Sequence, residues 1–355
     1  MEDGTTAGVA GAGAGAGRGI SLDTVARFVD IAVDALAEAR EEIDALNVYP
    51  VPDGDTGTNM YLTVVAARDA VREAQAQPDA ERSAILTALS RGALLGARGN
   101  SGVILSEMLG ATVRRIALAT PDETNAEVIA DALRQASAAS YAAVGEPVEG
   151  TMLTVLRAAA EAAATRAGKP GARSSDVLAE AAAAAREALG RTPEQLDVLA
   201  QAGVVDAGGR GLSVILDAAE TVLTGRRPIP VTVPLGSHAI PVPLVAAQGA
   251  DLCEDGPAYE VMYLLDAPDD AAPPLRRSLG ELGDSVVVVG GAGLWNVHVH
   301  TDDVGAAIEA GLGLGRPYRI RVTHFAEQIA RQEAQQEAPA LPVLTGRRVV
   351  AVAAG

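Results

Sequence analysis

Nine segments with apolar residues at helical spacing follow one another between Ser21 and Leu223. In the first of them, Val25, Val29 and Val33 recur four positions apart, which places them on one face of a helix. Many of the others are rich in alanine and apolar around much of their circumference, as expected for helices that pack against neighbours on both sides. The pattern predicts an all-helical barrel or bundle over residues 20–225. Its expected helices are Ser21–Leu46, Asn59–Ala74, Glu81–Leu95, Val103–Ala117, Asn125–Val144, Gly150–Ala167, Ser174–Leu189, Pro193–Ala202 and Arg210–Leu223.

The pattern changes after Leu223. Gly225–Pro243 contains five prolines and no helical period, so residues 226–245 are predicted to be an extended linker. Residues 246–330 then alternate short β-branched segments with helical ones, which predicts a smaller α/β middle domain. Strands are expected at Tyr259–Leu265, Asp284–Gly290, Leu294–Thr301 and Tyr318–Val322, and helices at Pro273–Leu282 and Asp303–Leu314.

The two ends of the chain differ from this body. Gly4–Gly19 is a Gly/Ala tract, so residues 1–19 are predicted to be a flexible tail. At the other end, Arg347–Gly355 begins an apolar strand and stops, and a single apolar strand needs a sheet to join. We therefore interpret residues 331–355 as a linker and the first strand of a truncated C-terminal domain; the alternative is that Val349–Ala354 docks on the middle domain.

Charge and composition narrow the possible partners. The formal charge of −18 argues against nucleic acid and anionic membrane surfaces, because both reward clusters of Lys and Arg. Lys169 is the only lysine, so positive charge near a phosphate must come from arginine, backbone amides or a metal. Cys253 is the only cysteine, which suits a reducing cytoplasm, and no apolar span approaches about 18 residues, the length needed for membrane insertion.

Two carboxylates, Asp53 and Asp55, stand one residue apart in a loop of prolines and glycines. Mg²⁺ binds through one or two carboxylates together with water and phosphate oxygens, so this loop is a candidate magnesium and phosphate site. The alternative is an ordinary Asp/Gly surface turn. Short polar side chains that can reach phosphate or metal-bound water follow at Thr56, Thr58 and Asn59.

A second glycine segment consists of Gly99, Asn100, Ser101 and Gly102, and we expect it to precede an apolar helix directly. A helix N-terminus offers free backbone amides to an anion, so this segment can form a phosphate cradle without a lysine. An Asn/Ser helix cap with turn glycines is the alternative. The sequence Asp206-Ala207-Gly208-Gly209 also comes before an apolar run, although such a pattern is usually just a turn.

The segment Asn47–Met60 resembles the signature of the dihydroxyacetone kinase L-subunit (DhaL) domain family, in the form carried by fatty acid kinase A proteins. Gly96–Ser106, Pro147–Thr154 and Gly203–Gly211 resemble its other motifs, in the expected order, and the resemblance covers roughly residues 20 to 330. It implies an ATP/ADP site in which Asp53 and Asp55 hold Mg²⁺. It also implies that Thr151 and Met152 lie on the adenine side and that the stretch with Asp206 and Gly208 closes over the nucleotide.

One position departs from the typical L-subunit pattern, which has a third aspartate five residues before Asp53. Here that position is Val48, and the nearest polar residue is Asn47. Asn47 either supplies a neutral carbonyl ligand to the metal or only fixes the loop.

His298 and His300 alternate along a predicted strand and therefore share one of its faces. The run resembles the middle domain of fatty acid kinase A, where paired histidines are implicated in function and join a cysteine at a metal. The cysteine position is Ala258 here, which leaves two ligands where zinc needs three or four. A role beside the substrate or a partner is therefore favoured over zinc. Without the resemblance, a polar solvent face on a half-buried strand is the simpler interpretation.

The resemblance implies an ATP-dependent kinase whose acceptor is a fatty acid carboxylate presented by a separate fatty-acid-binding carrier protein. A carrier makes physical sense because a long acyl chain does not stay alone in water. Two alternatives remain open: phosphorylation of glycerone, and a regulatory subunit that binds ADP-Mg without turnover. A homodimer is also possible.

Overall fold

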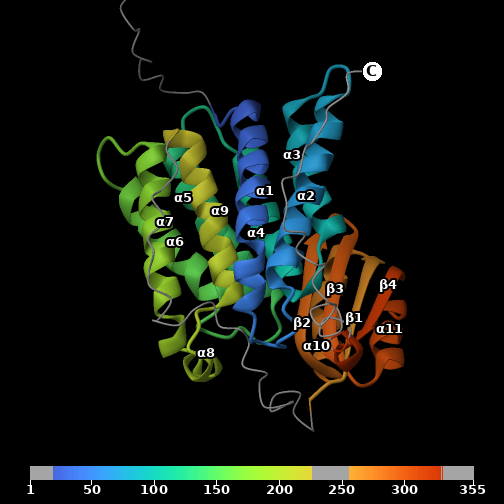
Figure 1. Ribbon diagram of the computed structural model, residues 1–355. Coiled ribbons are helices and arrows are strands. Elements are labelled where there is room, and N and C mark those ends of the chain that lie inside the picture. Colours follow the sequence, from blue (N-terminus) through green and yellow to red (C-terminus); the bar gives the residue numbers. More distant parts are fainter. Residues whose placement is uncertain (1–18, 226–255, 329, 331–355) are drawn as a thin grey trace, which may run out of the picture.

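The computed structural model describes residues 19–225, 256–328 and 330 (Figure 1). The predictions for the N-terminal tail, the proline-rich linker, Cys253 and residues 331–355 lie outside these ranges, apart from Gly19. The first described range is helical throughout, as predicted. Its elements are α1 (Leu22–Ala45), α2 (Thr56–Gln75), α3 (Arg82–Gly96), α4 (Gly99–Ala117), α5 (Asn125–Ala143), α6 (Met152–Ala167), α7 (Ser174–Gly190), the 3₁₀ turn η1 (Thr192–Glu194), α8 (Asp197–Ala202) and α9 (Ala207–Thr224).

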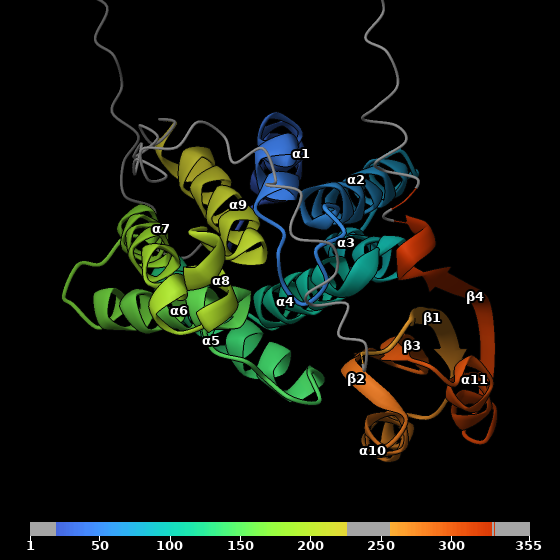
Figure 2. The ribbon, with the colours of Figure 1, turned by 60° about the horizontal axis from the view of Figure 1, so that its bottom comes forward.

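Eight of the helices in this range form a closed ring. Each of α1 to α6 contacts the next helix, α7 contacts α9, and α9 contacts α1 (Figure 2). Consecutive helices run in opposite directions, as short connections between neighbours require. The α1–α2, α3–α4, α5–α6 and α7–α9 connections therefore all lie at one end of the ring, which we call the motif end because every predicted nucleotide motif falls on one of them.

Three helices, α2, α4 and α9, begin three or four residues earlier than predicted. The first turn of α4 contains Gly99–Gly102, and α9 begins at Ala207, whereas glycines indicate loops because they are poor helix formers. The α9 start is explained by Asp206, whose Oδ2 accepts a hydrogen bond from Gly209 N at 2.6 Å. The predicted helix Pro193–Ala202 is in fact the 3₁₀ turn η1 followed by the short helix α8. The glycines of these two motifs thus lie in the first turns of α4 and α9, where backbone amides have no partner within the helix.

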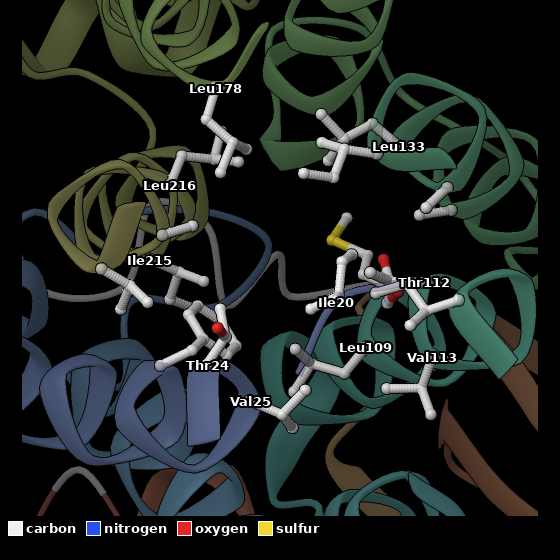
Figure 3. A pocket seen from close by; sticks show the side chains of 18 of the residues that line it. Ile20, Thr24, Val25, Leu109, Thr112, Val113, Leu133, Leu178, Ile215 and Leu216 are labelled. Atoms are coloured by element: carbon white, nitrogen blue, oxygen red, sulfur yellow. The ribbon is translucent and has the colours of Figure 1, made fainter. Parts of the chain in front are cut away.

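The opposite half of the ring encloses an apolar cavity of about 390 Å³ (Figure 3). Its lining includes Ile20 and Val25 at the start of α1 and Thr112 and Val113 near the end of α4. With a rise of 1.5 Å per residue, Val25 lies roughly 30 Å along α1 from the motif end. The lining is mostly apolar and contains no charged side chain, which suits an apolar ligand better than a phosphate.

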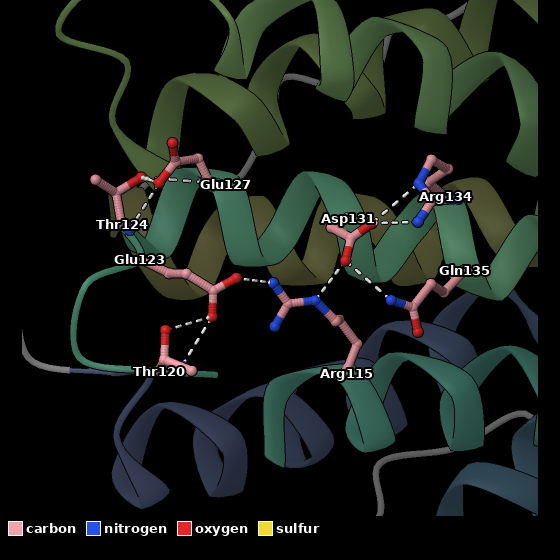
Figure 4. A network of polar contacts seen from close by, with 8 residues as sticks. All are labelled: Arg115, Thr120, Glu123, Thr124, Glu127, Asp131, Arg134 and Gln135. Carbon is pink, nitrogen blue, oxygen red and sulfur yellow. Dashed lines mark hydrogen bonds and ion pairs between the residues drawn. The ribbon is translucent and has the colours of Figure 1, made fainter. Parts of the chain in front are cut away.

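The same far end carries a polar network that joins α4 to α5 (Figure 4). The guanidinium of Arg115, whose side chain is 10% exposed, donates hydrogen bonds to Glu123 and Asp131. Asp131 also accepts from Arg134 and from Gln135 Nε2 at 2.9 Å. This buried cation is fully paired, so the network stabilises the α4–α5 connection and leaves no charge free for a ligand.

The second described range forms the predicted α/β domain. Its elements are β1 (Tyr259–Asp266), the 3₁₀ turn η2 (Asp269–Ala271), α10 (Ala272–Gly280), β2 (Gly283–Gly291), β3 (Leu294–Thr301), α11 (Val304–Leu312) and β4 (Arg316–His324). The sheet is antiparallel with strand order β2-β3-β1-β4. Val297 and Val299 pack in one core with Leu275 of α10, while Met262 and Val287 pack in the core of the helical ring. Strands β2, β3 and β1 are therefore covered on both faces, by α10 and α11 and by the ring, whereas the edge strand β4 is largely exposed.

The domain interface includes direct polar contacts. Gly145 N donates to Val286 O at 2.8 Å, and Asn296 Nδ2 donates to Leu94 O at 2.9 Å. Figure 1 shows the sheet beside the lower part of α2, α3 and α4, which is the motif end. The α/β domain is thus packed against the same end of the ring as the nucleotide motifs.

Candidate functional site

Asp53 and Asp55 lie on the α1–α2 connection, and Asp55 is the residue before the first turn of α2. The close approach of α2 to α1 depends on Gly57, because a Cβ there would lie 2.4 Å from the carbonyl oxygen of Arg40. Asp44, in the last turn of α1, accepts hydrogen bonds from Thr58 N at 3.0 Å and Thr58 Oγ1 at 2.8 Å. The hydroxyl of Thr58, predicted to reach phosphate, therefore anchors the loop to α1.

Each carboxylate has one oxygen fixed by an asparagine. Asn47 Nδ2 donates to Asp53 Oδ1 at 2.5 Å, and Asn59 Nδ2 donates to Asp55 Oδ1 at 2.7 Å. The other oxygens share a neighbour, because Gln328 Nε2 lies 3.4 Å from Asp53 Oδ2 and 3.2 Å from Asp55 Oδ2. The two Oδ2 atoms thus converge on one point.

Burial raises the pKa of the Asp53 carboxyl well above its usual value, and the charges of Asp55 and Glu260 raise it further. Burial also raises the pKa of Asp55. The hydrogen-bond donors to these two carboxylates in the described ranges are neutral amides. Two half-buried negative charges without a nearby cation are costly, so the pair favours a proton or a metal ion.

The first turn of α4 packs directly on the first turn of α2. A Cβ on Gly99 would lie 2.3 Å from Asn59 Nδ2, and one on Gly102 would lie 2.5 Å from Thr63 Oγ1. Asn100 Oδ1 in this turn is buried without a hydrogen-bond partner among the described residues. The predicted group Gly99, Asn100, Ser101 and Gly102 is therefore brought next to Asn59, which binds the Asp55 carboxylate, and Asn100 contributes an acceptor oxygen without a described donor.

The first turns of α6 and α9 form a second pair. Thr151 precedes α6, and its hydroxyl donates to Val148 O at 2.8 Å. A Cβ on Gly208 would lie 3.2 Å from the sulfur of Met152, which is buried. Burial raises the pKa of Asp206 to about 7, against hydrogen bonds from backbone amides that lower it. This pair joins the first through Gly211, since a Cβ there would lie 2.4 Å from the sulfur of Met60 in α2.

His298 and His300 do not form a polar solvent face, so that simpler interpretation is wrong. The side chains lie on the sheet face turned to the helical ring, and the residues are 0% and 5% exposed. His298 Nδ1 lies 2.9 Å from Ser285 O and Nε2 lies 3.1 Å from Glu260 Oε1. Both neighbouring atoms are oxygens that can accept hydrogen bonds from the ring. The sequence suggested a half-buried strand, but β3 is buried on both faces because the helical ring covers the face that carries the histidines.

Glu260 is a site residue that sequence reasoning missed. It pairs with His300 across β1 and β3, a register that the sequence of neither strand reveals. Burial alone would raise the pKa of Glu260, but the hydrogen bond from His298 and the charges of both histidines lower it overall. Ligand atoms of Glu260, His298 and His300 lie within 4.8 Å of one another, so this group supplies three of the donors that a metal ion needs.

The two clusters are neighbours. The charge of Glu260 raises the pKa of both Asp53 and Asp55. The ring of Phe325, which is 2% exposed, lies edge-on to His300 with 4.8 Å between centroids. The helical turn at residues 325–328 then brings Gln328 to the aspartates. The histidines and the carboxylate pair therefore belong to one composite site between the domains.

Comparisons with known proteins fit this arrangement. The DAK2 domain model matches residues 50–221, and the model of the fatty acid kinase A-like middle domain matches residues 256–332. Protein YloV of Bacillus subtilis (strain 168) is 36% identical over 330 residues, which are 89% of this chain and 58% of that protein. An uncharacterized protein of Staphylococcus haemolyticus is 34% identical over 309 residues, 85% of this chain and 55% of that protein. The chain thus spans little more than half the length of these relatives.

The crystal structure of the dihydroxyacetone kinase of C. freundii in its native form aligns with a TM-score of 0.41 and 18% identity, over 62% of this chain and 38% of that one. This likeness is too weak to establish a common fold. A search of the helices in the described ranges found none long and apolar enough to cross a membrane.

Proposed function

We propose that this chain transfers a phosphoryl group from ATP with the help of Mg²⁺. The premise is that the chain belongs to the kinase family that joins a DAK2 domain to a fatty acid kinase A-like middle domain. The observation that carries this proposal is the convergence of Asp53 Oδ2 and Asp55 Oδ2 at the motif end of the ring. The first turns of α2 and α4 pack on each other beside that point, and a helix N-terminus favours an anion such as phosphate.

The residues present fit a magnesium ion. Asp53 and Asp55 offer hard carboxylate oxygens, which Mg²⁺ prefers, and Asn100 has a buried oxygen that lacks a donor. Asn47 Nδ2 faces two acceptors, Val51 O at 3.3 Å and Asp53 Oδ1, so we assign it the role of fixing the loop rather than that of a ligand. A bound Mg²⁺ would neutralise charge on the phosphates of the nucleotide.

Backbone amides in the first turn of α4 are proposed to hold the phosphates, together with Ser101 and Thr56. Asn59 orients Asp55, and Thr58 anchors the loop. At the adjoining pair of helix starts, Thr151 and Met152 are proposed to line the base and Asp206 and Gly208 to close that side. The chain supplies positions and partial charges, which are the main protein contributions to phosphoryl transfer.

A fatty acid carboxylate on a separate carrier protein is the proposed acceptor, and the match of the middle domain to the fatty acid kinase A-like type supports it. Because His298 and His300 are buried, we assign them positioning roles: His298 fixes Glu260, and His300 supports Phe325. Glu260 adds a third ligand atom to the two histidines, but we propose no zinc here because both ring nitrogens of His298 already have hydrogen-bond partners. A cytoplasmic location and a homodimer stay proposals.

ATP turnover by the chain, measured with lipid-loaded carrier, with glycerone and with neither, tests the function. We expect consumption of ATP only with loaded carrier. Consumption with glycerone alone would favour a glycerone kinase. Tight ADP-Mg binding without turnover under all three conditions would contradict the kinase proposal and favour the regulatory role.

A further inference from the structure

Gln328, which follows β4 of the α/β domain, contacts both carboxylates of the Asp53 and Asp55 pair. Its Nε2 is within 3.4 Å of one oxygen of Asp53 and one of Asp55, which are more than 270 residues away in sequence. The remaining oxygens of the two carboxylates are occupied by Asn47 and Asn59. The amide of Gln328 therefore stands at the point where a cation shared by Asp53 and Asp55 would be bound.

The contacts made by this amide are weak. Distances of 3.2 and 3.4 Å lie at or beyond the long end of the range for an N–H···O hydrogen bond, whereas Asn47 and Asn59 approach to 2.5 and 2.7 Å. A neutral amide also compensates two half-buried carboxylates poorly. Of the three amides that contact these carboxylates among the described residues, that of Gln328 is therefore the least costly to displace when a cation binds.

A glutamine amide carries an acceptor oxygen as well as donor hydrogens, and a half-turn about its Cγ–Cδ bond exchanges their positions. We propose that Gln328 makes this turn and becomes a ligand from the α/β domain, with Oε1 completing the Mg²⁺ site of Asp53 and Asp55. Amide oxygens are accepted ligands of hard divalent cations. Cation binding is thereby coupled to the docking of the α/β domain, and the inference rests on the proposed magnesium site.

The backbone that carries Gln328 is held in place. Phe325 N donates to Ala258 O at 3.1 Å, and the buried Phe325 ring lies against His300. Glu327 N donates to His324 Nδ1 at 3.4 Å. A ligand on a fixed turn loses less conformational freedom on binding than one on a loose segment. Strand β3, through the contact of His300 with Phe325, thus helps to hold the turn that carries Gln328.

An opposite role would also place the amide at this point: Gln328 could compete with the cation for the carboxylates. The two roles differ in sign. Removal of a ligand weakens cation binding, whereas removal of a competitor strengthens it.

Binding of Mn²⁺, a paramagnetic probe of the magnesium site, should be measured by electron paramagnetic resonance on the whole chain without nucleotide. We expect Gln328→Ala to weaken Mn²⁺ binding about 10-fold, in the range typical of lost metal-site contacts. Gln328→Glu, which keeps an oxygen ligand, should not weaken it. Gln135→Ala is the matched control, because that amide also donates to an aspartate, Asp131, but at the far end of the ring.

Unchanged or tighter Mn²⁺ binding by Gln328→Ala would overturn the inference while leaving the proposed function standing. The double variant Asp53→Asn with Asp55→Asn tests the proposed magnesium site itself. If it binds as much Mn²⁺ as the wild-type chain, or if the wild-type chain binds none, that site is refuted. Thermal unfolding separates a purely structural role: loss of packing would lower the midpoint of Gln328→Ala without Mn²⁺ but would leave its Mn²⁺ affinity unchanged.

Discussion

Half-buried carboxylates lie on both sides of the domain interface, but the two sides compensate their charge differently. On the α/β side, Glu260 contacts His298, and the histidines hold the pKa of Glu260 below its usual value. On the ring side, the donors to Asp53 and Asp55 among the described residues are neutral amides, and burial raises the pKa of both carboxyls. A carboxylate with a cationic partner in the fold contributes to stability, whereas a carboxylate without one is suited to bind a cation from solution.

Replacement of both aspartates should break the ring side of this contrast. Asp53→Asn with Asp55→Asn removes the anionic oxygens, so we expect Mg-nucleotide affinity to fall more than 1,000-fold, or more than about 4 kcal/mol, by titration calorimetry. Stability without Mg²⁺ should not fall, because two half-buried like charges are lost. The control replaces two exposed aspartates, Asp69 and Asp122, in the same way. Retained tight binding by the first variant would refute the metal assignment.

Asp206 extends the ring-side pattern, because backbone amides are the donors to this buried carboxyl in the described part of the chain. Its folded pKa of about 7 exceeds the usual 3.8, so the folded state holds the proton more tightly. Its contribution to stability is full below about pH 4 and is lost as pH rises through about 7. Asp206→Asn should therefore be more stable than wild type at pH 8, by about 4 kcal/mol, and equal to it at pH 4.

Urea unfolding of the nucleotide-free chain at both pH values measures this difference. Asp131→Asn provides a control of opposite sign, because hydrogen bonds from Arg115 and Arg134 outweigh burial and lower the pKa of Asp131. That variant should lose stability at pH 8. An Asp206→Asn variant that is less stable than wild type at pH 8 would show that the charged form of Asp206 is compensated in the fold.

His298→Ala tests the α/β side. It leaves Glu260 buried without its main partner, which should cost about 2 kcal/mol in urea unfolding, less than a fully buried pair because the Glu260 side chain is 17% exposed. Mg²⁺ affinity should not weaken, since the freed negative charge lies near Asp53 and Asp55. His324→Ala, on the same sheet but half-buried, is the control and should cost less. A large loss of Mg²⁺ binding in His298→Ala would mean that the two clusters act as one ligand set.

Much of the architecture followed from local pattern. Helices and strands were confirmed within a few residues wherever apolar periodicity was clear, as in α1 and β3. The starts of α4 and α9 were missed because glycine favours loops, while packing of Gly99 against Asn59 and capping by Asp206 decided otherwise. Glu260 and Gln328 could not be found, since their partners come from another strand and another domain.

The sequence by itself determined the chemistry available at each end of each helix. Asp53 and Asp55 are one residue apart, so any fold of this loop keeps them together, and Asn59 follows within the reach of one helical turn. Only the tertiary structure decided what those groups meet. Closure of an up-and-down ring brings the first turns of α2, α4, α6 and α9 to one end, and docking of the sheet buries His298 and delivers Gln328. Burial, pKa and convergence depend on surfaces that distant segments cover, and such coverage is not encoded in any local pattern.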